Sequence, residues 1–132
     1  MKLYTRMPAS LQPFFREALD LHEQAMLHKD LVEAWHQLER AHVIGQAYPY
    51  QHSKAHWKML VFGCKIKNVN EILGQIPRLL VGGVKSFVGN IPVGNTGGAN
   101  VPPMRSMPIH DEIKTIFIQA GVRIPRSTAD MK

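Results

Sequence analysis

Hydrophobic residues recur every three or four positions along most of the chain, which is the period of an α-helix with one buried face. In the first such stretch, Leu11 to His28, the residues Phe15, Leu19 and Met26 fall on one side. The alternation of apolar and polar residues that marks a half-buried strand persists nowhere in the sequence. The pattern therefore predicts an all-α fold.

Capping residues and prolines divide this pattern into about five helices. Asp30, followed by Glu33, has the residue types of a capping box at the start of a second helix. Pro49 suits the first turn of a third helix, a fourth is predicted near residues 71–81, and a fifth runs from about residue 108 to 121. Short connections favour antiparallel hairpins of neighbouring helices, packed as a small bundle.

Residues 89–107 are dense in Gly, Asn and Pro and predict one long loop. We expect this loop to be ordered and to pack over the helices as a lid or brace, with an anion-binding nest of glycine N–H groups as the alternative. Residues 1–9 are expected to form a loose lead, and residues 122–132 a frayed basic tail. The whole chain, residues 1–132, is then a single helical domain.

The composition agrees with a globular protein. Of its 132 residues, 45% are hydrophobic and 20% are charged, which separates the chain from disordered proteins. The longest apolar runs are too short to span a bilayer, and the first residues lack the apolar core of a secretory signal. We therefore expect a cytoplasmic protein that does not enter a membrane.

The charge and the single cysteine narrow the choice of ligands. The net charge is +6, but the basic residues are scattered, with the densest group at Lys54, Lys58, Lys65 and Lys67. No basic stripe interleaved with aromatic residues is present, so a solvated basic face is favoured over nucleic-acid binding. A lone Cys64 excludes an intramolecular disulfide and the multi-cysteine zinc sites. A metal ion would have to be bound by nitrogen and oxygen.

The second predicted helix places polar, metal-capable side chains on a face that we expect to be buried. At 100° per residue, Trp35, His36, Glu39 and His42 lie on one side of it. Glu39 is near the middle of this stripe. A buried carboxylate without a partner costs several kcal/mol or becomes protonated, so the fold has to supply a cation, a strong donor or a metal ion.

The third predicted helix repeats this pattern, because His52 and His56 are spaced i, i+4 on one face. In an antiparallel hairpin, His42 falls between the levels of His52 and His56, and Glu39 comes near the level of His56. The same counting across the preceding turn brings His22 toward the second helix. The predicted metal ligands are therefore Glu39, His42, His52, His56, His36 and His22.

Imidazole and carboxylate groups are the ligands of borderline divalent ions, so the predicted cofactor is Zn²⁺, Fe²⁺, Cu²⁺, Ni²⁺ or Co²⁺. Two alternatives stay open. In one, the polar cluster is a structural core network and the chain is a helical module that binds a protein partner or a second copy of itself. In the other, the chain is a metal-dependent enzyme with Glu39 as general base, although no nucleophile constellation is present.

Four segments, WHQLERAH from Trp35, QHSKAH from Gln51, PVGNTGGANV from Pro92 and MPIHDEI from Met107, resemble a family of small bacterial helical proteins known as a domain of unknown function. The resemblance covers most of residues 10–120. Members of that family are often associated with heavy-metal resistance and cation-efflux genes, which implies a role in metal handling. It implies no assigned activity or ligand set, and His110 stands where a second proline is expected.

Overall fold

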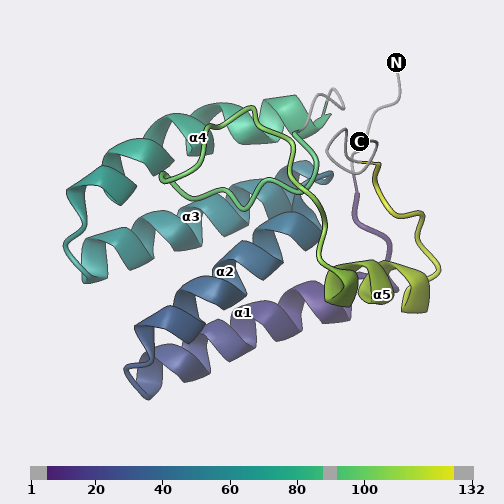
Figure 1. Cartoon of the computed structure of the whole chain (residues 1–132), viewed down its shortest axis with the longest axis horizontal. Coiled ribbons are helices and arrows are strands. Elements are labelled where there is room, and N and C mark those ends of the chain that lie inside the picture. Colours follow the sequence, from purple (N-terminus) through teal and green to yellow (C-terminus); the bar gives the residue numbers. More distant parts are fainter. Residues whose placement is uncertain (1–5, 88–91, 127–132) are drawn as a thin grey trace.

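The computed structural model describes residues 6–87 and 92–126 (Figure 1). Within these ranges it contains five α-helices and no strand, so the predicted all-α fold is confirmed. The helices are α1 (Gln12–Leu27), α2 (Leu31–Gly45), α3 (Pro49–Lys65), α4 (Val69–Phe87) and α5 (Asp111–Gln119). Parts of the predicted lead, long loop and tail, at residues 1–5, 88–91 and 127–132, lie outside the described residues.

Consecutive helices pack against one another, α1 on α2, α2 on α3 and α3 on α4, in the hairpin order that the sequence predicts. Figure 1 shows the four helices side by side in chain order, with the described part of the segment after α4 lying over α3 and α4 before it reaches α5. α5 contacts α2, and the Arg40 Nε–Glu112 Oε1 ion pair at 2.9 Å joins these two helices. No helix in residues 6–87 or 92–126 is long and apolar enough to cross a lipid bilayer.

The turns that close the α1–α2 and α3–α4 hairpins share one design. In each, a lysine adopts the left-handed conformation, with φ of 57° at Lys29 and 58° at Lys67. The next residue, Asp30 or Asn68, begins the following helix by accepting a hydrogen bond of 3.1 Å from the backbone N–H three residues on. Both caps satisfy a donor that a helix start would otherwise leave unpaired.

The similarity of the two hairpins continues beyond their turns. The second helix of each hairpin carries the same polar series at the same spacing: Glu33, Gln37 and Arg40 in α2, and Glu71, Gln75 and Arg78 in α4. In both series the glutamine amide donates to the glutamate, at 2.7 Å in α2 and 2.6 Å in α4. Glu33 therefore uses its carboxylate here and not to complete the predicted capping box. The hydrophobic pattern alone does not reveal this repetition.

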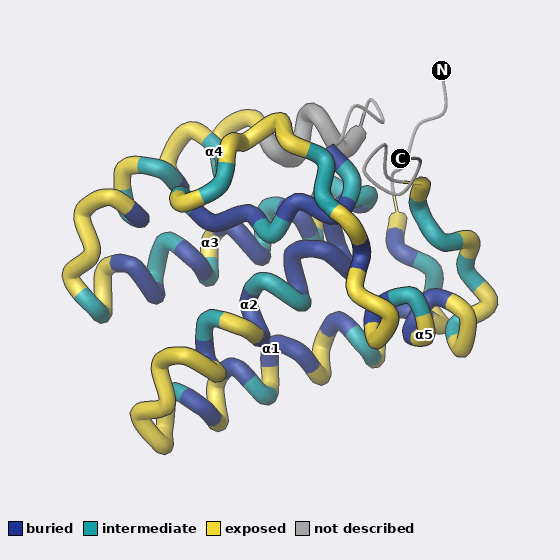
Figure 2. Tube along the Cα trace, viewed as in Figure 1, coloured by how far each residue is buried: buried dark blue, intermediate teal, exposed yellow. Residues whose placement is uncertain are grey.

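The buried face of α2 is rotated from the predicted one, although His42 is buried as predicted (Figure 2). Ala34, Leu38 and Ala41 are 0% exposed, whereas Val32 is 84% exposed and His36 is also exposed. The reason is packing: α2 lies between α1 and α3, and a stripe that contains small alanines allows both neighbours to approach closely. The predicted stripe was centred on polar residues such as Glu39. The observed buried stripe is rotated about the helix axis toward Ala34, Leu38 and Ala41.

Two helix boundaries also differ from the prediction. α4 starts at Val69 and includes Pro77 within its length, and it runs through the glycine pair to Phe87. α5 starts at Asp111 and not at Pro108, because His110 is extended with ψ of 146°. Asp111 and Glu112 occupy the first turn of α5, where negative charge is favourable.

Residues 92–107 pack over the helices, as the brace interpretation predicts. The Gln46 side chain of α2 donates to the Pro92 carbonyl at 2.7 Å and accepts from the Gly94 N–H at 3.2 Å. Within the segment, the Met107 N–H donates to the Val93 carbonyl at 3.0 Å and so joins the two ends of the loop. A buried glutamine thus connects the segment to the end of α2.

Gly94→Ala is expected to lower the free energy of unfolding more than Gly121→Ala. Both glycines have positive φ, 81° and 67°, so each substitution carries left-handed strain of about 1–2 kcal/mol. A Cβ at Gly94 would also overlap the Met107 carbonyl oxygen, whereas a Cβ at Gly121 meets nothing within 4 Å. Urea denaturation of the two variants measures the difference. Equal losses would contradict the close packing of this segment.

Candidate metal centre

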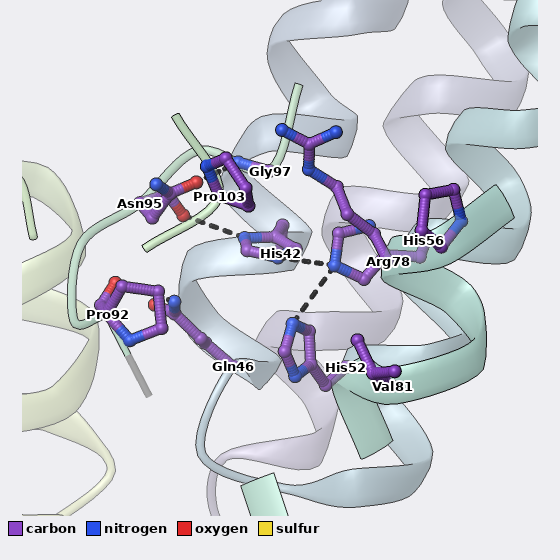
Figure 3. A pocket seen from close by; sticks show the side chains of 11 residues that line it. His42, Gln46, His52, His56, Arg78, Val81, Pro92, Asn95, Gly97 and Pro103 are labelled. Carbon is purple, nitrogen blue, oxygen red and sulfur yellow. Dashed lines mark hydrogen bonds between the residues drawn. The ribbon is translucent and has the colours of Figure 1, made fainter. Parts of the chain in front are cut away.

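Three of the predicted ligands meet at one point between α2 and α3 (Figure 3). His42 comes from α2, and His52 and His56 come from α3; their exposed fractions are 1%, 5% and 3%. The Nε2 atom of His56 lies 3.1 Å from His42 Nε2 and 3.0 Å from His52 Nε2. Nitrogen ligands bound tetrahedrally at 2.0–2.1 Å from a Zn²⁺ ion are about 3.3 Å apart, so these two separations are close to those of a metal site. All three ligand atoms lie within 4.8 Å of one another.

The backbone determines which nitrogen of His42 carries hydrogen. His42 Nδ1 lies 2.8 Å from the carbonyl oxygen of Asn95. A carbonyl oxygen only accepts, so Nδ1–H must be the donor of this bond. In the neutral ring, Nε2 then carries a lone pair, and this lone pair points at His56.

A glutamine from α4 determines the tautomer of His56 in the same way. His56 Nδ1 lies 2.7 Å from Gln75 Oε1, while Gln75 Nε2 donates to Glu71 Oε1 at 2.6 Å and to the Gly97 carbonyl at 2.9 Å. Because both partners of the amide nitrogen are acceptors, the Gln75 oxygen must face the ring. His56 Nδ1 therefore donates, and His56 Nε2 also carries a lone pair.

Two lone pairs thus face each other across 3.1 Å, at His42 Nε2 and His56 Nε2. Burial, followed by the nearby imidazoles of His56 and His52, keeps the pKa of His42 well below its ordinary value. Burial also lowers the pKa of His56 to about 4, although its bond to Gln75 opposes this shift. At neutral pH neither ring supplies a proton between the two nitrogens, so the contact between them is not a hydrogen bond. A cation shared by the two nitrogens would satisfy both lone pairs.

Behind His56, the hydrogen bonds continue to a buried carboxylate. Glu71 accepts from Gln75, and both of its oxygens lie 3.2 Å from the Ala99 backbone N–H. Partners of this kind orient a metal-binding histidine and increase its basicity. The ring of His56 is therefore held by a series of groups from α4 and residues 92–101.

The same loop segment holds His42. The Asn95 side chain donates to the carbonyls of Pro102 and Arg105, at 2.9 and 2.8 Å, and accepts from the Gly97 N–H at 2.8 Å. Gly97 has φ of 88°, and a Cβ there would lie 2.7 Å from His42 Cδ2. Only a glycine allows the backbone to approach the imidazole this closely.

Glu39 and His36 do not join the three histidines, contrary to the predicted convergence. Both lie on the side of α2 that faces away from its buried stripe, where His36 is exposed and Glu39 is half-buried. Burial raises the pKa of the Glu39 carboxyl, and a hydrogen bond from the Thr96 hydroxyl partly offsets this shift. Glu39 thus has a partner in the loop segment and needs no metal ion.

His22 is buried as predicted but also stays outside the cluster. Its Nδ1 atom is 2.8 Å from the Ala34 carbonyl, and its ring centroid is 6.2 Å from that of Phe62. These contacts connect α1 to α2 and α3 within the core. His22 therefore has the environment of a satisfied core histidine.

Gln75 and Asn95, which orient His56 and His42, were not among the predicted site residues; their exposed fractions are 0% and 2%. Gln75 had one detectable signal: it is a polar residue among Ile72, Ile76 and Leu79 and repeats the position of Gln37. Asn95 lies in a loop, where no periodicity indicates burial. Its importance depends on a contact with a residue 53 positions away.

The three histidines border a cavity of about 250 Å³. Its walls are otherwise mostly apolar, and they include Pro77, Val81, Pro92 and Pro103, with Arg78 as the charged residue. Figure 3 shows the Arg78 side chain beside the histidines, with its guanidinium group on the side of Gly97. An ion held by the three imidazoles would have one side facing this cavity.

The chain belongs to the family described as protein of unknown function (DUF3703), which matches residues 9–117. Comparison with curated proteins finds no match, and comparison with solved structures finds none either. The predicted resemblance to a family of unknown function is thus confirmed. The family description assigns no activity, so the function has to be argued from the site.

In metal-free protein, the free energy of unfolding is expected to fall as the pH drops from 6.5 to about 4. These are the ordinary pKa of histidine and the folded-state pKa of His56, so between them the unfolded chain binds a proton that the folded chain does not. At about 1.4 kcal/mol per pKa unit, the loss is on the order of 3 kcal/mol. Urea denaturation with chelator, at a series of pH values, measures it. A His56→Gln variant should lack this part of the slope, and identical slopes would contradict a neutral, buried imidazole.

Proposed function

We propose that this chain is a metal-binding protein that holds one divalent transition-metal ion through the Nε2 atoms of His42, His52 and His56. The ion would lie between α2 and α3, beneath residues 92–103. Burial keeps His42 and His56 neutral, so metal binding at these two rings requires no loss of a proton at neutral pH. Metal binding would connect two helices and the covering segment.

The pair of facing lone pairs at His42 Nε2 and His56 Nε2 carries this proposal. A structural network would have a donor opposite each acceptor, because buried polar groups are normally hydrogen-bonded. Here both Nδ1 atoms are committed as donors to Asn95 O and Gln75 Oε1. A cation satisfies both nitrogens, whereas hydrogen bonding between the two neutral rings cannot.

Three imidazole nitrogens suit Zn²⁺, Cu²⁺, Ni²⁺, Co²⁺ and Fe²⁺. The absence of a carboxylate from the ligand set disfavours Mg²⁺ and Ca²⁺, which prefer oxygen. Intrinsic affinity favours Cu²⁺ over the other divalent ions, and metal supply in the cell modifies this order.

A role in metal handling or resistance in the bacterial cytoplasm follows if the resemblance to metal-resistance-associated proteins holds. The alternative of a metal enzyme with Glu39 as general base loses its support, because Glu39 does not line the cavity beside the histidines and bonds to Thr96. We therefore favour binding, storage or transfer of the ion.

Protein purified without chelator and reconstituted with Zn²⁺ is expected to hold one ion per chain. His42→Ala, His52→Ala and His56→Ala should each raise the dissociation constant by more than about 100-fold, because each removes a ligand and even second-shell changes cost 10–100-fold. Elemental analysis and competition with a chromophoric chelator measure content and affinity.

Matched controls come from the predicted ligands that lie outside the cluster. His36→Ala and Glu39→Gln should bind metal as the parent protein does, and far-UV circular dichroism should report equal helix content in all five variants. Unchanged metal content in the three cluster variants would refute the site. Loss of metal in the two controls instead would assign binding to the outer side of α2.

A second function, self-association, is favoured by the outer face of α4. Val69, Leu73, Ile76 and Leu80 are 64%, 62%, 43% and 74% exposed and are spaced four, three and four residues apart, as in the seam of a coiled coil. Within residues 69–81 the charged side chains are Glu71, which is buried, and Arg78, which bonds to residues 74 and 101. The stripe is therefore free of charge, and we infer that a second copy of the chain covers it.

Leu73→Glu is expected to convert a dimer into a monomer, because it places two like charges in the seam and removes an apolar contact worth roughly 1.5–3 kcal/mol per fully buried side chain. Val32→Glu is the control, since Val32 is 84% exposed on α2 and away from this stripe. Sedimentation velocity measures the mass. A monomeric parent protein at micromolar concentration would contradict self-association.

A further inference from the structure

The cavity beside the three histidines has a polar side, which also includes Gln46 and Asn95, and an apolar side. His42, His52 and His56 border it together with Arg78, and the apolar part includes Pro77, Val81, Pro92 and Pro103. A metal ion bound by three protein nitrogens keeps at least one coordination position for another ligand. Since all three histidines line the cavity, a ligand in that position would extend into it (Figure 3).

The positive charges at the histidine side of the cavity favour the binding of an anion. The three imidazoles are neutral ligands, so the ion keeps its two positive charges, and Arg78 adds a third. The buried carboxylate of Glu71 already accepts from Gln75 and the Ala99 N–H and does not line the cavity. Arg78 is partly buried, and a concentration of positive charge that is partly shielded from water is costly unless a negative group balances it.

Arg78 is held rigidly where it can contribute to such binding. Its Nη1 donates to the Gly74 carbonyl at 2.7 Å and its Nη2 donates to the Val101 carbonyl at 2.8 Å. A guanidinium group has five N–H donors, so these two bonds leave others for a ligand.

Building on the metal site proposed above, we propose that the cavity binds a small carboxylate with a short apolar tail. One carboxylate oxygen would occupy the free position on the metal ion, and Arg78 would balance the charge. The tail would lie among the prolines and Val81. At about 30 Å³ per water-sized group, the cavity accommodates roughly eight non-hydrogen atoms.

The test uses Co²⁺-loaded full-length protein, because the visible bands of Co²⁺ respond to a change of ligand. Elemental analysis first establishes one cobalt per chain. Butanoate, acetate, azide and butan-1-ol are then titrated separately. Butanoate should shift the bands with saturation and bind about tenfold more tightly than acetate, since it buries two more methylene groups. Butan-1-ol should leave the spectrum unchanged.

Two variants separate the roles of charge and shape. Arg78→Gln should weaken butanoate binding at least about tenfold while the protein still binds one cobalt per chain, and Arg78→Lys should restore part of the butanoate binding. Val81→Phe narrows the apolar end, so it should remove the preference for butanoate over acetate without changing acetate binding. Because the Val81 side chain is apolar and cannot form a hydrogen bond, this variant stays informative if Arg78→Gln disturbs the loop.

The outcomes distinguish the two proposals. A chain that binds no cobalt overturns both. One cobalt per chain with no spectral response to butanoate overturns the carboxylate proposal alone. Azide binding more tightly than butanoate, with no effect of Val81→Phe, would assign the position to small inorganic anions and also overturn it.

Discussion

The hydrogen bond from His42 Nδ1 to the carbonyl of Asn95 is the contact on which the site depends. It commits one nitrogen of the ring as a donor and leaves the other as a lone pair. It also connects α2 to a loop segment that the side chain of Asn95 closes through two carbonyls. Since Gly97 of that segment accepts from Gln75, the hydrogen bonds link α2, the loop and α4 around the three imidazoles.

The tandem hairpins explain how such a site arises in a small helical domain. Glutamine and glutamate pair in the same way in α2 and α4, so both hairpins contain the same local support. In the first hairpin, Gln37 Oε1 accepts from Arg40 at 3.3 Å. In the second, the equivalent oxygen of Gln75 accepts from His56. The change of partner places the second glutamine beside a histidine that we propose as a metal ligand.

Much of the fold can be predicted from the sequence because its signals are local. The helical period predicts the helices, and Asp30 and Pro49 mark the starts of α2 and α3. The i, i+4 spacing of His52 and His56 and the short turn before them also predict the meeting with His42. The orientation of α2 was predicted wrongly, since small residues such as Ala34 and Ala41 form a weak hydrophobic signal but allow the closest packing. The hydrogen-bond partners of the two rings were not predicted, because Gln75 is 19 positions from His56 and Asn95 is 53 positions from His42.

The two ring orientations rest on chemically different acceptors, and this makes the ligands unequal under mutation. The acceptor of His42 is a main-chain carbonyl, which every residue type at position 95 retains. The acceptor of His56 is the side chain of Gln75, which a single codon change can replace. A substitution at position 75 therefore changes the electron density on the His56 imidazole, because the acceptor becomes a carboxylate or is lost. The backbone carbonyl at position 95 keeps the acceptor of His42 unchanged. Differences in metal preference between related chains would then be found on α4, outside the set of coordinating residues.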